Sequence, residues 1–121
     1  MDSLPVAAGL STGLLLLAAL MVYIARSGEG LGVNSEIGIR TGATKASAEA
    51  WVASHRAAAA SLTAGSWVAA GAAVLTVVVA VVVDDATVVG IVGVLGYAAT
   101  IYRLVVATRR ANKAARQVST P

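Results

Sequence analysis

Three long apolar stretches constrain this chain more than any other feature of its sequence. They cover residues 4–25, 62–83 and 86–107; the first two contain no charged residue, and the third contains only Arg103. A helix of about 22 residues is about 33 Å long, enough to cross a hydrocarbon core of about 30 Å. Residues 77–83 are mostly valine, but an isolated strand in lipid would leave its backbone groups unpaired. We therefore expect helices throughout.

The composition is typical of an integral membrane protein. The chain is 58% hydrophobic and only 12% charged, whereas soluble globular domains carry about 25% charged residues. It contains no cysteine, which excludes disulfides, thiolate metal sites and cysteine nucleophiles. We predict an all-α integral membrane fold with three transmembrane helices, in a single membrane domain over residues 1–121.

The first apolar stretch could also be read as a signal peptide. No Lys or Arg precedes it and no A-x-A cleavage pattern follows it, so we expect a retained helix. Tyr23 and Arg26 then mark its exit, an aromatic ring at the headgroup level followed by a cation. Only Asp84 and Asp85 separate the second and third stretches, which predicts a tight antiparallel helical hairpin with an exposed turn.

The basic residues predict the orientation of the chain. Apart from Arg103, every Lys and Arg lies in the segment 26–61 or in the tail 108–121, and none lies at the N-terminus or in the Asp84–Asp85 turn. The positive-inside rule then places the N-terminus outside and the C-terminus in the cytoplasm of a bacterial plasma (inner) membrane. This topology accounts for the net charge of +3, so the lipid bilayer is the expected partner and nucleic acid is not.

The segment between the first two stretches is polar. Its glycines predict a loop over residues 27–41. A helix should follow from near Thr44, whose hydroxyl can cap it, because alanine is frequent after that point. We predict an amphipathic interfacial helix there, either separate or continuous with the second span. For the tail we expect a fraying helical extension that ends in disorder.

Four side chains of this segment are spaced by three and four residues: Thr44, Ser47, Trp51 and His55. On a helix beginning near Thr44 they would share one face. The apolar stretches would then form a membrane frame that holds this polar and aromatic stripe in place.

These residues also resemble a known motif. The pattern is an asparagine, then G-I-R-T, then T-x-x-S-x-x-x-W-x-x-x-H, between two membrane spans. It resembles the signature of the SdpI family, bacterial membrane proteins named for an immunity protein against a secreted toxic peptide. Where some members have Pro-Trp after the Arg-Thr pair, this chain has Gly42 and Ala43, and it resembles a short three-span form. The resemblance implies binding of a toxic peptide or a regulatory protein through the motif, which consists of Asn34, Gly38, Arg40, Thr41, Thr44, Ser47, Trp51, His55 and Arg56.

Individual motif residues keep alternative interpretations. Arg40 could bind a lipid headgroup or a partner carboxylate, or it could pin the loop through Glu36 or Glu49. Trp51 could anchor at the headgroups or pack against the ring of His55, or it could be a hot spot for a partner. His55 could cap or stack, or it could sense pH, since its unperturbed pKa lies near neutrality.

Enzymatic functions find no support in the sequence. There is no G-x-S-x-G, phosphate-binding loop or H-E-x-x-H motif, so we expect no enzyme, no cofactor and no metal. Transport needs an ionisable group within the bundle, and the spans offer only Arg103, which we expect to snorkel toward the surface. The second hypothesis is a small structural or accessory subunit of a larger membrane complex; a small transporter is the third.

Glycines recur in the first and third spans. They leave one side of each helix without side chains, at Gly9 and Gly13 in the first span and at Gly90, Gly93 and Gly96 in the third. Close packing within one chain is the first interpretation of this pattern, and a homo-oligomer face is the second.

Overall fold

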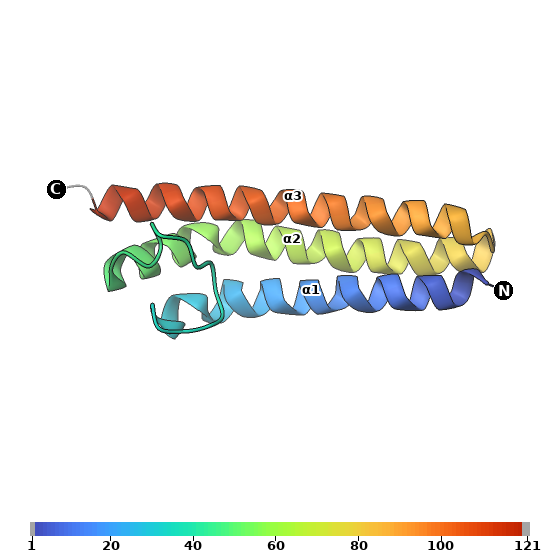
Figure 1. Cartoon of the computed structure of the whole chain (residues 1–121), viewed down its shortest axis with the longest axis horizontal. Helices are drawn as coiled ribbons and strands as arrows, with labels where there is room; N and C mark the ends of the chain where they lie inside the picture. Colours follow the sequence, from blue (N-terminus) through green and yellow to red (C-terminus); the bar gives the residue numbers. More distant parts are fainter. Residues whose placement is uncertain (1, 120–121) are drawn as a thin grey trace.

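The computed structural model describes residues 2–119, which form three helices side by side (Figure 1). They are α1 (Ser3–Leu31), α2 (Ala48–Val82) and α3 (Ala86–Ser119). All three are long and apolar enough to cross a membrane, and no strand occurs within the described residues. The prediction of an all-α fold with three helices of membrane-spanning length is confirmed.

The two ends of the bundle differ. The N-terminus and the turn between α2 and α3 lie at one end, here named the turn end, as Figure 1 shows. The loop between α1 and α2 (residues 32–47) and the C-terminal part of α3 lie at the other end, here named the loop end. The predicted antiparallel hairpin is present. Which end faces the cytoplasm stays a prediction from the charges.

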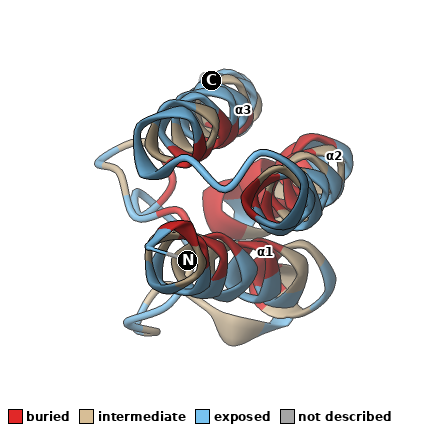
Figure 2. Cartoon of the chain, turned by 90° about the vertical axis from the view of Figure 1, so that its right-hand side faces the viewer, coloured by how far each residue is buried: buried red, intermediate tan, exposed pale blue. Residues whose placement is uncertain are grey.

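Small side chains hold the helices together. Figure 2 shows the buried sides of the three helices facing one another, and most of their buried residues are alanine, glycine, serine or threonine. Without a hydrophobic driving force in lipid, association depends on such close approach. A Cβ on Gly13 would clash with the Tyr97 hydroxyl, which donates to the Leu10 carbonyl at 2.9 Å. The outer sides carry large apolar residues, as a lipid-facing surface requires.

The glycines of the first and third spans divide into those that pack against another helix and those that do not. A Cβ on Gly93 would lie 2.5 Å from Leu10, and a Cβ on Gly96 would lie 2.7 Å from Ala72. These positions and Gly13 serve packing within the chain, as the first interpretation predicted. Gly9 and Gly90 have no neighbouring atom within 4 Å of an added Cβ, so they take no part in that packing.

Helix α1 runs further than the sequence predicted. The loop was expected from residue 27, but the helix continues through Gly28 and Gly30 to Leu31. Glycine costs about 1 kcal/mol in a helix interior, and tertiary contacts offset this cost at Gly28. A Cβ there would lie 2.6 Å from the His55 ring, so only glycine lets α2 come this close.

Helix α2 begins at Ala48 and not near Thr44. Ser47 is its N-cap, with extended backbone angles and a side-chain oxygen that accepts from the Ala50 N–H at 3.0 Å. The predicted interfacial helix is not seen as a separate element. Residues 48–60 are the first turns of α2 and continue without a break into the second span, which is the other option that the sequence left open.

Helix α3 is ordered beyond the third apolar stretch. Ala107, Ala111 and Ala115 are spaced by four residues and are fully buried. Ala107 and Ala111 belong to the same core cluster as Met21 and Leu62. The predicted helical extension is confirmed for the described residues, and this alanine face packs it against the bundle at the loop end. The expected disorder at residues 120–121 lies outside the described residues.

The turn end is closed by acidic residues. The Asp85 side chain accepts from the N–H groups of Thr87 and Val88, at 2.9 and 3.2 Å, and so satisfies the first turn of α3. The Ser3 hydroxyl donates to the Asp84 carboxylate, which ties α1 to the turn. These contacts confirm the predicted turn.

Candidate functional site

Trp51 is the most buried large side chain of the motif. It has an exposed fraction of 0%, and its indole Nε1–H donates to the Gly28 carbonyl of α1 at 2.8 Å. Gly28 lies in the last turn of α1, where carbonyls lack partners within the helix. The indole therefore caps α1. The interpretation of Trp51 as an interfacial headgroup anchor is wrong.

The ring of His55 stacks on Trp51. Their centroids are 4.1 Å apart with an angle of 27° between the planes, because residues four apart share one face of a helix. Ring packing between these two residues is confirmed. Trp51 and His55 thus form a continuous aromatic wall that faces α1 and the loop.

The hydrogen bonds of His55 define its protonation state. Its Nε2 accepts from the Ile39 N–H at 3.0 Å, so this nitrogen carries no proton. Nδ1 then carries the proton of the neutral ring and donates to the Trp51 carbonyl at 2.9 Å; the Ser54 hydroxyl lies 3.2 Å away. His55 precedes the uncharged part of α2 that spans the membrane, and burial lowers its pKa. Both ring nitrogens are occupied within the protein.

Gly38 fits the loop against this aromatic wall. Its φ of +129° is a backbone conformation that other residues rarely adopt. An added Cβ would lie 2.9 Å from both the Trp51 and the His55 rings. The motif therefore needs glycine at this position for two independent reasons.

Thr41 and Thr44 close the loop on itself and on α3. The buried Thr44 hydroxyl donates to the Ile39 carbonyl at 2.6 Å and accepts from the Thr41 N–H at 2.9 Å. The Thr41 side chain accepts in turn from the Thr44 N–H at 3.2 Å. It also donates to the Asn112 side-chain oxygen on α3. The Thr44 hydroxyl thus holds the loop and does not cap a helix.

The remaining motif residues are exposed. Arg40 donates to the Val33 carbonyl at 3.5 Å, and among the described residues it forms no ion pair with Glu36 or Glu49. Its contact within the loop is thus one long hydrogen bond to a backbone oxygen, not an ion pair. Asn34 and Ser47 are exposed as well.

Among the described residues, Arg56 carries the one ion pair of the motif. Its guanidinium binds the Glu29 carboxylate of α1. The hydrogen bond from Arg56 lowers the pKa of the Glu29 carboxyl. Because both groups are solvent-exposed, this pair contributes little to stability.

The motif thus divides into two groups. One group, here named the buried lock, ties the loop to all three helices. It consists of the buried Thr44, Trp51 and His55 and the half-buried Gly38 and Thr41. The other is the outer group, which consists of Asn34, Arg40, Ser47 and Arg56. The predicted single face of four side chains is wrong, since Thr44 and Ser47 precede the helix. Only Trp51 and His55 share a face.

Sequence reasoning missed the partners of the lock. Gly28, the Ile39 backbone, Ser54 and Asn112 each bond to a motif residue. The repeated alanines at 107, 111 and 115 were a signal that the tail has a buried face. Nothing in the sequence pairs Asn112 with Thr41. Within residues 2–119, no three His, Asp or Glu side chains gather as a metal ion requires.

Three apolar helices with a polar loop locked over one end define a small multi-pass membrane protein. Residues 31–106 match the SdpI/YfhL protein family, a match that covers more than half of the chain and includes the whole motif. The chain belongs to this family, as its motif predicted. No curated protein and no solved structure matches the chain.

Proposed function

We propose that this protein is a non-enzymatic immunity or sensing protein that binds a toxic peptide or a regulatory protein at its loop end. Family membership supports a role of this kind. The observation that carries the proposal is the division of the motif. A fully bonded lock holds the loop in one conformation, while polar side chains of the same motif remain exposed on it.

The exposed part of the loop has the chemistry of a peptide-binding surface. Arg40 and Asn34 offer hydrogen-bond donors, and Ile37 between them is 43% exposed. A cation next to an apolar side chain suits a peptide that is both amphipathic and able to reach a membrane surface. Because the lock fixes the loop beforehand, binding costs little ordering entropy.

We further propose that the loop end lies in the cytoplasm of a bacterial plasma membrane. Arg40, Lys45 and Arg56 support this orientation together with the basic residues of α3, whereas Asp2, Asp84 and Asp85 lie at the turn end. A cytoplasmic loop would favour a regulatory protein, or a block on the inner leaflet, over direct capture of an arriving peptide.

Photo-crosslinking in living cells tests the binding proposal. A photoreactive residue at Ile37 should yield a specific adduct with a peptide or a soluble regulator, and the mass of the adduct distinguishes them. A photoreactive residue at Val88 is the matched control, because Val88 is also an exposed apolar residue but lies at the turn end. Arg40→Ala should reduce the adduct at Ile37. Equal adducts from both positions would contradict the proposal.

The alternative function is a small structural or accessory subunit of a larger membrane complex. The buried lock favours this alternative in one respect, since these motif residues hold the helices and the loop of the protein itself together. It predicts crosslinks from the lipid-facing sides of the helices to one large membrane protein, and no adduct from Ile37.

A further inference from the structure

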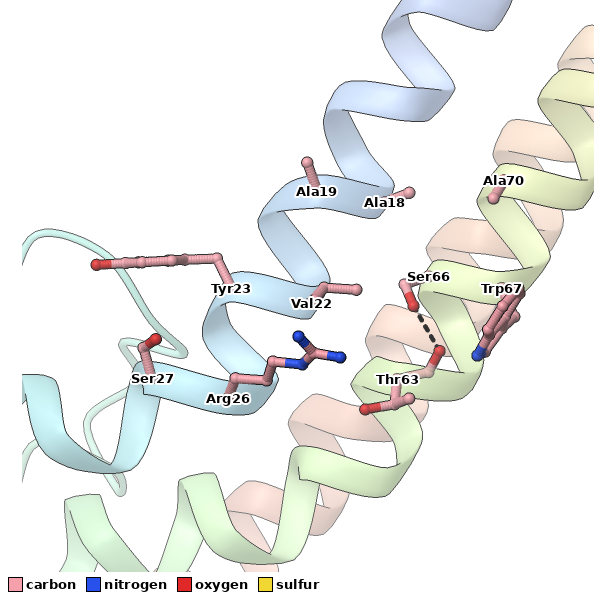
Figure 3. Close-up of a pocket in the computed structure, with 10 residues that line it drawn as sticks. All are labelled: Ala18, Ala19, Val22, Tyr23, Arg26, Ser27, Thr63, Ser66, Trp67 and Ala70. Atoms are coloured by element: carbon pink, nitrogen blue, oxygen red, sulfur yellow. Dashed lines mark hydrogen bonds between the residues drawn. The ribbon is translucent and has the colours of Figure 1, made fainter.

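A groove lies between α1 and α2, and the side chains that line it do not belong to the motif. It has a volume of about 590 Å³, and Figure 3 shows the side chains that line it. Val22 and Arg26 point from α1 toward α2, where Thr63 and Ser66 face them. Nothing in the proposed function uses this groove.

One end of the groove is polar and holds a cation without a counterion. Within residues 2–119, Arg26 forms no ion pair and no hydrogen bond. The nearest acid along α1 is Glu29, one turn away, and its carboxylate is taken by Arg56. The guanidinium of Arg26 is thus free to bind an anion, and it suits a phosphate group in particular.

Two hydroxyl groups of α2 face this cation. The Thr63 and Ser66 hydroxyls donate to backbone carbonyls of their own helix, at 2.9 and 2.6 Å, which leaves their oxygens as acceptors toward the groove. Ser27 also lines the groove next to Arg26. A phosphodiester whose headgroup carries hydroxyls matches this combination of a cation with acceptor oxygens.

The other end of the groove is apolar. Ala18, Ala19 and Ala70 line it, and their small side chains leave a channel that a hydrocarbon chain can fill. Tyr23 and Trp67 flank the groove and are 44% and 74% exposed, as aromatic residues at the headgroup level are. Arg26 directly follows the uncharged stretch 4–25. From the Arg26 end to the alanine end, the groove therefore changes from polar to apolar, as a phospholipid does from its headgroup to its acyl chains.

From these contacts we infer that the groove between α1 and α2 is a binding site for an anionic phospholipid. The phosphodiester binds Arg26, the headgroup hydroxyls bind the Thr63 and Ser66 oxygens, and one acyl chain lies along Ala18 and Ala70. Charge complementarity and the polarity gradient assign this occupant.

Fluorescence quenching by brominated lipid tests the site on the whole chain. Purified protein is reconstituted in vesicles of phosphatidylcholine and phosphatidylglycerol, with bromine on the chains of one lipid or the other. Trp67 flanks the groove and reports on the lipid in it, whereas the buried Trp51 adds a constant background. We expect about fivefold preference for phosphatidylglycerol, the effect of one basic residue near the surface.

Two variants separate the site from general surface charge. Arg26→Gln should bring the preference close to one, while Arg109→Gln, which removes an exposed cation from α3 at the same end, should leave it unchanged. Val22→Phe should also lower the preference, because it fills the groove and keeps Arg26. A preference that survives Arg26→Gln or Val22→Phe would overturn the inference. So would competition by millimolar glycerol phosphate, since the site would then bind a soluble anion.

Discussion

The indole of Trp51 offers the sharpest test of the buried lock. Trp51→Phe keeps an aromatic ring against His55 but removes the N–H that donates to the Gly28 carbonyl. That carbonyl belongs to the last turn of α1 and has no partner within its helix. It would be left buried without a hydrogen bond.

The magnitude follows from two contributions. An unsatisfied buried carbonyl costs about 1–3 kcal/mol. The smaller ring leaves a cavity beside a side chain that is 0% exposed, which costs about 1 kcal/mol more. We therefore expect Trp51→Phe to lower the free energy of unfolding by about 2–4 kcal/mol.

Trp67→Phe is the matched control, because Trp67 lies on the same helix but is 74% exposed. It should change stability by less than about 0.5 kcal/mol. Unfolding of the purified protein in mixed micelles, with increasing mole fraction of dodecyl sulfate and followed by circular dichroism, measures both variants. If the two variants unfold at the same mole fraction, the indole does not cap α1 and the reasoning is refuted.

Three further predictions follow from the loop end. Because the pKa of His55 is lowered in the folded protein, the unfolded chain binds more protons near pH 6.5. The free energy of unfolding should therefore decrease as the pH is lowered from 6.5, by at most about 1.4 kcal/mol per pH unit. In micelle unfolding curves, His55→Gln should remove this dependence. Gly38→Ala should destabilise by more than about 1 kcal/mol through its positive φ and the contact with the rings, whereas Gly42→Ala, where an added Cβ meets nothing within 4 Å, should be neutral in the same assay. Since the chain has no cysteine, Ala46→Cys and Thr87→Cys can each be probed in intact cells with an impermeant thiol reagent. We expect labelling of position 87 alone, whereas labelling of position 46 alone would reverse the proposed orientation.

The sequence by itself determined the membrane class, the number of spans and the tight turn. These features depend on local properties: the length of an uncharged stretch, the absence of room between two such stretches, and the acidic pair that ends one helix and caps the next. The motif determined the family in the same way, because its residue types and spacing are read directly along the chain.

Helix boundaries depended on contacts, within the loop and between helices, that the residue types do not specify. Thr44 and Ser47 are both of residue types that favour the N-cap position, serine more than threonine. Ser47 caps α2 because the Thr44 hydroxyl is engaged by the Ile39 carbonyl and the Thr41 N–H. Likewise, α1 passes through Gly28 because another helix packs there, which outweighs the low helix propensity of glycine.

The direction of the motif side chains was also decided only in three dimensions. A tryptophan and a histidine four residues apart predict contact with each other, but not whether they face lipid, solvent or protein. Trp51 faces inward because it meets Gly28, 23 positions away, and the loop is fixed because Thr41 meets Asn112, 71 positions away. Contacts across such separations arise only when the helices pack, and so they leave no periodic trace in the sequence.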